Sequence, residues 1–395
     1  MQPLSPSDVT EWLIADKAEE NALIDEKEAI KPVEELPLRV QAVGMKAVST
    51  VKLDGQNQLD KRKRRWVVFG NKQTHGLNYE NTHSPCTQLV TLRVIFMLSL
   101  VWLLEGFALD VITCFLNSQL DTNESIFVTF PDGRTIRGCR CGRLLSSVHG
   151  LKQAPRVWYY TSKKWLLQYD DRLRVSSVEP CLFYIWLPPT LIVLLYVHVD
   201  DYFCFTDQEE WRTTSSVLLG RSTSASTRDR ALTSCTTPLV VAAYKDADHA
   251  ADKVTRQSVT GSLVTLNGGP MMFSSKLQKT VALSGTDAEP MVLTETARDA
   301  EYCYHLLSEI AVVETPMALH GDNHASVYQA ENALNNSATR HLAVRCDFFT
   351  ASQRGASPSG RRIAFTGEGM PSEGRERLPG EGHVLQREEA SPPSG

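Results

Sequence analysis

The sequence lacks a long uninterrupted hydrophobic run. Its most apolar stretch, residues 89–104, carries Arg93 in its interior and is shorter than the roughly 18–20 apolar residues that a membrane-spanning helix needs. The first twenty residues carry acidic side chains, where a signal peptide would have an apolar core. We therefore predict a buried helix at residues 89–104, no membrane partner and an intracellular location.

Paired cysteines and a net positive charge are also lacking. The nine cysteines are odd in number, and Cys139 and Cys141 have no second pair at zinc-ligand spacing, so neither a disulfide framework nor a zinc module is expected. The formal net charge of -5 gives no global attraction to nucleic acid, so any such binding needs a local basic surface. With 42% hydrophobic and 22% charged residues, the composition is that of a globular protein.

The chain is long for a single core, because single cores stop growing near ~250–300 residues. Local composition predicts an α+β protein with an acidic, loosely attached N-terminal segment, a mixed region of strands and helices, a Ser/Thr-rich linker, an α/β region and a disordered Gly/Pro/Ser-rich tail. The corresponding boundaries are 1–39, 40–207, 208–237, 238–352 and 353–395.

Asp200 and Asp201 lie between two apolar runs, residues 191–199 and 202–205, which predicts a β-hairpin with acidic residues at its bend. Adjacent carboxylates repel each other unless a cation neutralises them. Asp110 follows another apolar element and offers a third carboxylate. Three carboxylates can hold two Mg²⁺ ions for in-line phosphoryl transfer, and a solvated Asp-Asp turn is the alternative.

Several segments occur in an order that resembles the reverse transcriptase of copia-type LTR retrotransposon Pol polyproteins. They are FALDVITCFLNSQLD (107–121), SSVHGLKQAPRVWY (146–159), EPCLFY (179–184) and LLYVHVDDYF (194–203), preceded by a fingers-like segment at residues 60–86. The resemblance extends over about residues 40–205. It implies a fingers/palm domain that acts on a primer-template and a dNTP with Mg²⁺ or Mn²⁺.

The same resemblance implies a role for individual residues. It gives Asp110, Asp200 and Asp201 as metal ligands, and Phe115 as an aromatic gate against the ribonucleotide 2′-hydroxyl. The implied substrate-binding residues are Lys63 and Arg65, which face the triphosphate, together with Phe115, Lys152 and Gln153. A guanidinium suits phosphate oxygens because its contacts are bidentate. A solvated basic face or a nuclear-import patch is the alternative for residues 61–65.

Residues 242–301 and 319–327 resemble the RNase H domain of the same family. This implies that Asp246, Glu289 and Asp322 hold two metal ions that act on the RNA strand of an RNA/DNA hybrid. Each residue also has a structural alternative. Asp246 can end a strand, Glu289 can belong to a Thr286 capping box, and Asp322 can cap a helix.

The chain departs from the family pattern around these carboxylates. Ala343 stands where relatives carry a fourth aspartate, and Asp347 follows one helical turn later, too far away to replace it. Pro290 takes the fourth position of the expected helix, about residues 287–310, and removes an amide there. Lys245 precedes Asp246 and is expected to compete with bound metal.

Only 45 positions separate Asp201 from Asp246, so the thumb and connection of the family are expected to be largely missing. Losing thumb contacts to backbone phosphates weakens the grip on a primer-template. We therefore predict an RNA-directed DNA polymerase with RNase H activity that is impaired in this chain. The alternative is an inactive remnant that at most binds nucleic acid, and the oligomeric state stays open.

Overall fold

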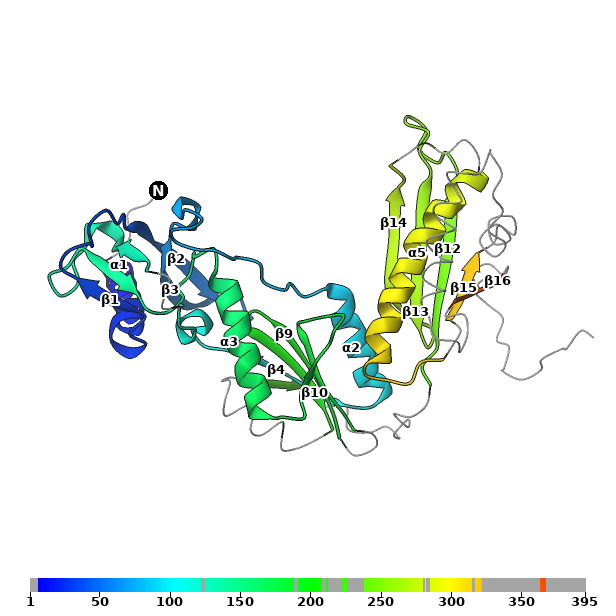
Figure 1. The fold of residues 1–395 in the computed structure, drawn as a ribbon, viewed down its shortest axis with the longest axis horizontal. Helices are drawn as coiled ribbons and strands as arrows, with labels where there is room; N and C mark the ends of the chain where they lie inside the picture. Colours follow the sequence, from blue (N-terminus) through cyan, green and yellow to red (C-terminus); the bar gives the residue numbers. More distant parts are fainter. Residues whose placement is uncertain are drawn as a thin grey trace, which may run out of the picture. The chain divides into compact units, whose positions relative to one another are not determined.

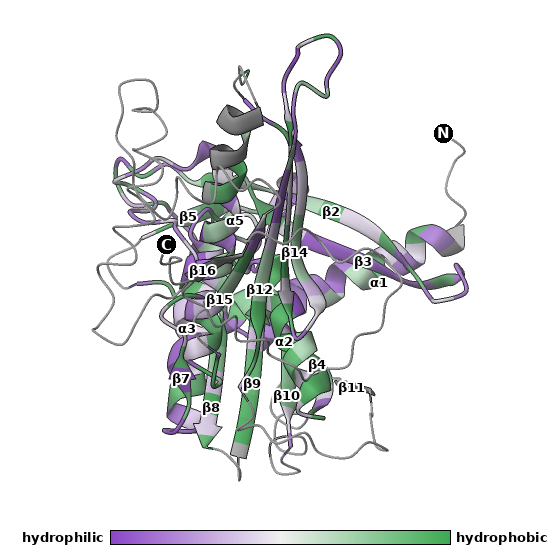
Figure 2. Ribbon diagram, turned by 90° about the vertical axis from the view of Figure 1, so that its right-hand side faces the viewer, coloured by the Kyte–Doolittle hydropathy of each residue, from purple (hydrophilic) through white to green (hydrophobic). Residues whose placement is uncertain are grey.

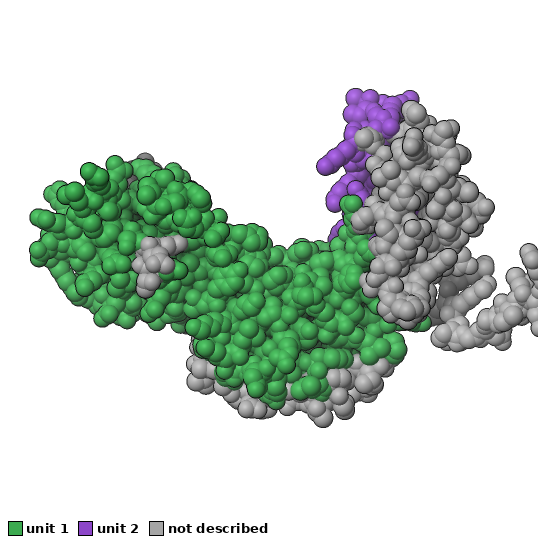
Figure 3. Space-filling view, in the orientation of Figure 1, with its two compact units in different colours: residues 1–241, 265–272, 298–314 green, residues 242–264, 273–297, 315–395 purple. Residues whose placement is uncertain are grey.

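The structure is a computed structural model that forms two compact units. The first comprises Met1–Val241, Thr265–Met272 and Arg298–Glu314, and the second comprises Ala242–Val264, Phe273–Ala297 and Thr315–Gly395 (Figure 3). The residues it describes are 6–121, 125–187, 191–207, 211, 222–225, 238–279, 281, 285–314, 317–321 and 363–366. Helices and sheets are mixed throughout, which confirms the α+β class.

The N-terminal part is a five-stranded sheet with the order β1-β6-β5-β2-β3, accompanied by helix α1 (Figure 1). The long β2 and β3 pair antiparallel and form a two-stranded ribbon. The bounds are α1 Pro6–Asn21, a π-helical turn Ala22–Glu26, β1 Ile30–Val33, β2 Val43–Leu53, β3 Leu59–Val68, a 3₁₀ turn Gly70–Lys72, β5 Phe127–Thr129, a 3₁₀ turn Pro131–Gly133 and β6 Cys141–Leu144.

Helix α1 is attached to β3 by charged side chains, so the prediction of a loose N-terminal segment is wrong for this helix. Asp16 is only 6% exposed. It accepts a 3.0 Å hydrogen bond from Trp66 Nε1 and pairs with Arg64 at 3.0 Å and Arg134 at 2.6 Å. Ion pairs and a buried hydrogen bond therefore provide much of the attachment of α1.

A second sheet follows with the order β11-β4-β10-β9-β8-β7, and α3 packs along it (Figure 1). The central β9 is hydrophobic along most of its length (Figure 2), as expected for a strand buried on both faces. The bounds are α2 Leu89–Val101, β4 Glu105–Asp110, a 3₁₀ turn Cys114–Asn117, α3 Ala154–Tyr169, β7 Arg174–Val175, β8 Leu182–Leu187, β9 Leu191–His198, β10 Asp201–Thr206 and β11 Ser222–Ala225.

The helix expected at residues 89–104 is α2. It buries Val94, Ile95 and Leu98 but leaves Leu89 and Leu100 exposed, so the prediction of a buried helix holds for one face. Within the described parts of the chain, no helix is both long and apolar enough to cross a membrane.

A third sheet has the order β14-β13-β12-β15-β16, and β12, β15 and β16 run parallel. The β13–β14 turn is Asn267-Gly268, with φ of 48° and 82°, and an Asn-Gly pair suits two positive φ angles. The bounds are β12 Val241–Asp248, β13 Val259–Leu266, β14 Gly269–Leu277, α5 Gly285–Ser308, β15 Met317–Gly321 and β16 Ile363–Thr366.

Helix α5 begins two residues before the expected start and runs through Pro290, which therefore lies in its second turn. Strand β16 falls within the predicted tail, and β11 falls within the predicted linker. The neighbouring stretches 212–221, 226–237 and 367–395 lie outside the described residues.

Replacing Asp16 by Ala should lower the free energy of unfolding by roughly 1–3 kcal/mol, because Trp66 Nε1 and two guanidinium groups lose a buried acceptor. Chemical denaturation monitored by tryptophan fluorescence measures the loss. The control is Asp25→Ala, which breaks an exposed ion pair with Arg137 and should cost about 1 kcal/mol or less. Equal losses in both variants would contradict a special role for Asp16.

Candidate active site

The antiparallel pairing of β4 with β10 brings two predicted carboxylates together. Asp201 lies directly opposite Asp110, and the next pair, Tyr202 and Leu109, points to the other face. Tyr202 and Leu109 are buried in the core, while both aspartates are exposed at the strand ends. The alternation of the strands therefore holds the carboxylates on the face away from this core.

The predicted hairpin at Asp200 and Asp201 is confirmed. His198 pairs with Asp201, so Val199 and Asp200 form a two-residue turn, and the Asp200 carbonyl accepts a 2.9 Å hydrogen bond from Val111 N. Val199 has a φ of 57°, a conformation that is costly for a β-branched residue. The Trp158 indole donates a 2.6 Å hydrogen bond to the Val199 carbonyl and so helps to hold the strained turn.

The three carboxylates interact electrostatically. Partial burial, followed by Asp200 and Asp110, raises the pKa of Asp201, while His198 acts in the opposite direction. Burial, with further contributions from Asp200 and Asp110, also raises the pKa of the nearby Cys114 thiol to about 12. The site thus gathers negative charge that a cation would offset, and the thiol beneath it stays protonated.

The donor chemistry of the site fits a hard divalent cation, because Mg²⁺ prefers carboxylate oxygens. However, among the residues that the structure describes, no three His, Cys, Asp or Glu side chains form a group that could hold a metal ion. The strand pairing brings Asp110, Asp200 and Asp201 to one end of β4 and β10. To bind an ion, their side chains would have to turn toward it.

His149 contacts Phe115 and lies near Lys63 and Arg65, three residues predicted to face the nucleotide. Its own role was not predicted from the sequence. Its ring lies edge-on to Phe115, with 5.1 Å between centroids. Burial, followed by Arg65 and Lys63, lowers the pKa of His149 to about 4, while Asp200 acts in the opposite direction. The available signal was its position before a glycine in the 146–159 block.

Gly150 allows the loop that carries His149 to lie against β3. Its φ is +94°, and a Cβ atom there would lie 2.2 Å from the Val68 carbonyl oxygen. Val68 N donates a 2.8 Å hydrogen bond to the His149 carbonyl. A side chain at position 150 would therefore displace the loop from β3.

Lys152 and Gln153 are bonded to the segment that contains Gln73 and Tyr79. The Lys152 ammonium lies 3.1 Å from the Tyr79 hydroxyl. Gln153 is 1% exposed, accepts from Gln73 Nε2 at 3.1 Å and donates to the Asn78 carbonyl at 2.9 Å. These bonds attach the pair to the 73–79 segment, and its role in substrate binding stays a prediction.

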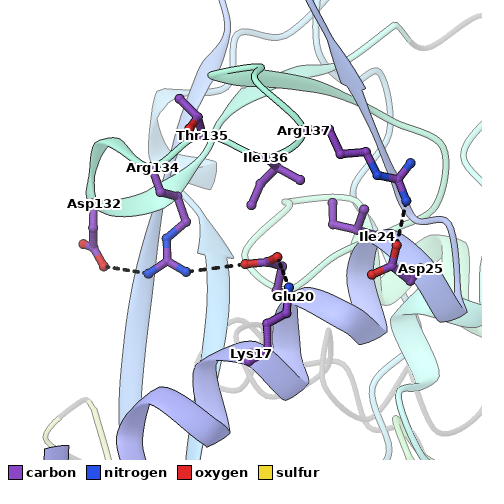
Figure 4. A pocket seen from close by; sticks show the side chains of 9 residues that line it. All are labelled: Lys17, Glu20, Ile24, Asp25, Asp132, Arg134, Thr135, Ile136 and Arg137. Carbon is purple, nitrogen blue, oxygen red and sulfur yellow. Dashed lines mark hydrogen bonds and ion pairs between the residues drawn. The ribbon is translucent and has the colours of Figure 1, made fainter.

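Two cavities lie near these elements. One of about 610 Å³ is lined by residues of the 76–81 loop and α3, including Gln153, Arg156 and Tyr160. The other, of about 480 Å³, lies between α1 and the 132–137 loop. Figure 4 shows that acidic and basic side chains of the second cavity pair with each other, as Arg137 does with Asp25 at 2.6 Å. Such paired charges favour a structural role.

In the second unit, Asp246 is exposed on β12, and the prediction that its neighbour Lys245 would compete with metal is not supported. Lys245 is 4% exposed and lies over Gly321, where a Cβ atom would be 2.6 Å from Lys245 Cε. Successive strand residues point to opposite faces, so the ammonium and the Asp246 carboxylate point to opposite sides of the sheet.

The other RNase H candidates fall on side chains or residues outside the described part of the chain. Glu289 is on α5, and its side chain is not described; Asp322, Ala343 and Asp347 lie outside the described residues. On the Asp246 face of the sheet, Tyr244 stacks on His320 with 4.6 Å between ring centroids.

The family comparison agrees with the carboxylate geometry. Residues 29–211 match the model of the reverse transcriptase (RNA-dependent DNA polymerase) family. This segment is therefore similar to the reverse transcriptase domain of copia-type transposon polyproteins. It contains the β4–β10 pair, His149 and the basic residues of β3.

The chain is also similar to transposon polyproteins. It is 24% identical over 439 residues to the Pol polyprotein of transposon TNT 1-94 from Nicotiana tabacum, covering 79% of this chain and 33% of the relative. It is 22% identical over 436 residues to that of transposon RE1 from Arabidopsis thaliana, covering 79% and 29%. The chain thus spans about a third of the length of these curated relatives.

A solved structure of LC11-RNase H1, isolated from compost by a metagenomic approach, is 14% identical. The match covers 33% of this chain and 85% of that chain with a TM-score of 0.26. A TM-score of this size defines no shared fold.

His149 should destabilise the protein in mild acid. Its pKa is lowered from 6.5 to about 4, so below pH 6.5 the unfolded state binds a proton that the folded state does not, and stability falls as the pH drops toward 4. Chemical denaturation at several pH values should show a smaller loss in His149→Gln than in the unaltered protein. Parallel pH profiles would contradict this assignment.

Proposed function

We propose that the chain is an RNA-directed DNA polymerase. Its fingers domain is formed by the β1-β6-β5-β2-β3 sheet, and its palm is formed by the sheet that contains β4 and β10. The observation that carries the proposal is the pairing of Asp201 with Asp110, next to Asp200, inside the segment that matches the reverse transcriptase family. The substrates would be a primer-template and a dNTP.

In the proposed reaction, the primer 3′-hydroxyl oxygen attacks the α-phosphorus of the dNTP and forms a new P–O bond. The bond from this phosphorus to the oxygen that bridges to the β-phosphate breaks, pyrophosphate leaves, and the hydroxyl proton is released to solvent. Asp110, Asp200 and Asp201 would hold Mg²⁺ or Mn²⁺. The bound ion would supply charge neutralisation at the phosphates and activation of the hydroxyl. Binding by this set needs the carboxylates to be ionised.

The remaining residues would position the nucleotide. Lys63 and Arg65 carry positive charge toward the triphosphate, and Arg65 can contact two phosphate oxygens at once. The lowered pKa of His149 keeps its ring neutral at neutral pH, so it packs against Phe115 without adding charge. Phe115 would exclude a 2′-hydroxyl by steric contact.

The third sheet supports a second proposal, an RNase H-like domain that cleaves the RNA strand of an RNA/DNA hybrid. Its central strand β12 carries Asp246, is flanked by β13 and parallel β15, and is followed in the chain by the long α5. The proposed ligands are Asp246, Glu289 and Asp322, and the cation would be Mg²⁺ or Mn²⁺.

We further propose that both activities are impaired. About 79% of 395 residues, or about 312 residues, are spread over the 439 aligned positions shared with the tobacco relative, which supports a large internal deletion such as a missing thumb and connection. Ala343 removes one family carboxylate. The alternative is an inactive remnant that only binds nucleic acid. It is favoured because the described side chains include no group of three His, Cys, Asp or Glu that could hold a metal ion.

Primer extension tests the polymerase. The unaltered protein should extend a DNA primer on an RNA template with Mg²⁺ or Mn²⁺, and the Asp200→Asn/Asp201→Asn variant should lose this activity by about 100-fold or more, because charge stabilisation at the phosphates is removed. Asp171→Asn, an exposed aspartate in the turn before β7, is the matched control. If none of the three proteins extends the primer, or if all three extend it equally, the polymerase proposal is wrong. The inactive remnant is then the remaining candidate.

Hybrid cleavage tests the second domain separately. A labelled RNA/DNA hybrid should be cut in Mn²⁺ or Mg²⁺, and Asp246→Asn should reduce the rate by about 100-fold or more for the same electrostatic reason. Asp248→Asn, two residues along the same strand face, should retain cleavage. Metal-dependent cleavage that survives in Asp246→Asn would point to a contaminating nuclease.

A further inference from the structure

Glu179 begins the 179–184 block and has no part in the proposed reaction, yet it is a buried acid. It is only 1% exposed, and within the described part of the chain it forms no ion pair. A buried carboxylate without a cation is costly unless hydrogen bonds satisfy its oxygens. The hydrogen bonds of Glu179 therefore indicate what it holds in place.

The backbone around Glu179 forms a rigid turn before β8. The Glu179 amide donates a 2.9 Å hydrogen bond to Ser176 Oγ, and the Glu179 carbonyl accepts one of 2.9 Å from Leu182 N. One side-chain oxygen, Oε1, accepts from Cys181 N at 3.2 Å. The side chain thus leaves the turn in a fixed direction, and Oε2 is available for a different element.

The second oxygen of Glu179 binds the start of α2. Oε2 accepts 3.2 Å hydrogen bonds from Gln88 N and from Thr91 Oγ1. Gln88 is the N-cap residue of α2, and its own side chain forms no capping bond. The Gln88 carbonyl accepts a 2.9 Å hydrogen bond from the Tyr196 hydroxyl of β9. The start of α2 is therefore held between the turn before β8 and strand β9, with a carboxylate at the positive end of the helix dipole.

Tyr302 fixes the direction of the hydrogen bond between Thr91 and Glu179. Its hydroxyl lies 2.7 Å from Thr91 Oγ1, and both residues belong to the first compact unit. Burial raises the pKa of Tyr302 to about 12, while the hydrogen bond with Thr91 acts in the opposite direction. The phenol therefore keeps its proton and donates it to Thr91. Because a hydroxyl has a single proton, Thr91 gives its own to Glu179.

The segment before α2 reaches the candidate active site through His198. Thr87, the residue before Gln88, shares a hydrogen bond with His198 Nδ1. His198 is paired with Asp201 on β10, and Asp201 is paired with Asp110 on β4. Directly paired residues of antiparallel strands point to the same face. The imidazole and the two carboxylates therefore lie in one row across three strands.

We propose that Glu179 is a positioning residue of the candidate active site. Through Gln88 and Thr91 it fixes the segment that carries Thr87, and Thr87 holds the His198 ring beside Asp201. The proposal rests on the proposed polymerase function and adds a residue that touches neither metal nor substrate. A purely structural Glu179 would stabilise the fold without affecting His198.

Histidine NMR of the full chain tests the proposal. With isotope-labelled histidine, the ring signal of His198 is identified by its loss in His198→Gln, and a pH of about 8.5 keeps the rings neutral because their ordinary pKa is near 6.5. The test variant is Glu179→Gln, whose amide can accept hydrogen bonds at only one end. The control is Asp16→Asn, which alters another buried carboxylate that accepts a hydrogen bond. Thermal melting establishes that each variant folds.

We expect the His198 signal to move in Glu179→Gln and to stay in place in Asp16→Asn, because only the first variant releases the segment before α2. If the signal stays in place in folded Glu179→Gln, or moves equally in both variants, the proposal is wrong. If Glu179→Gln does not fold, Thr91→Val and Thr91→Ser decide. The valine variant should move the signal, whereas the serine variant keeps the hydroxyl and should leave it in place; equal signals would contradict the proposal.

Primer extension adds a second readout if the unaltered protein is active. Glu179→Gln should lower kcat by about 10-fold, as is typical for residues that orient metal ligands without touching the metal, and should leave KM for the primer-template unchanged. An unchanged kcat would count against the positioning role. If the unaltered protein extends no primer, the polymerase proposal fails, and the NMR comparison still decides whether Glu179 positions His198.

Discussion

The register between β4 and β10 is the constraint on which the candidate active site depends. It pairs Asp201 with Asp110 on one face and Tyr202 with Leu109 on the other. A slip of one residue would turn every side chain of β10 to the opposite face, so the aspartate would enter the core and the tyrosine would leave it. The apolar residues beneath the sheet therefore fix the position of the carboxylates above it.

A second consequence of strand alternation is the separation of charge across β3. The acidic α1 takes up Arg62 and Arg64, and the other side of the strand keeps Lys61, Lys63 and Arg65. The N-terminal helix is thus part of the electrostatics of the domain. Its presence explains how a chain with a net negative charge can still offer a cationic surface.

Much of this arrangement could be predicted where the signal is local. The apolar runs around Asp200 and Asp201 predict the hairpin because burial of both flanks leaves only the bend for the acids. The direction of the Lys245 side chain could also be predicted, because successive strand residues point to opposite faces of the sheet. Its position next to Asp246 in the sequence instead suggested that the two side chains meet. Pairings between distant segments, such as His149 with Phe115 and Asp16 with Trp66, leave no periodic pattern that a sequence can reveal.

The close approach of Lys245 to Gly321 couples two positions that are far apart in the chain. The lysine stem lies over the glycine backbone, where a Cβ atom would lie 2.6 Å from Cε. A side chain at position 321 would have to displace the flexible end of the lysine side chain. The lack of a side chain at position 321 therefore leaves the space in which the buried Lys245 stem lies against the parallel strand.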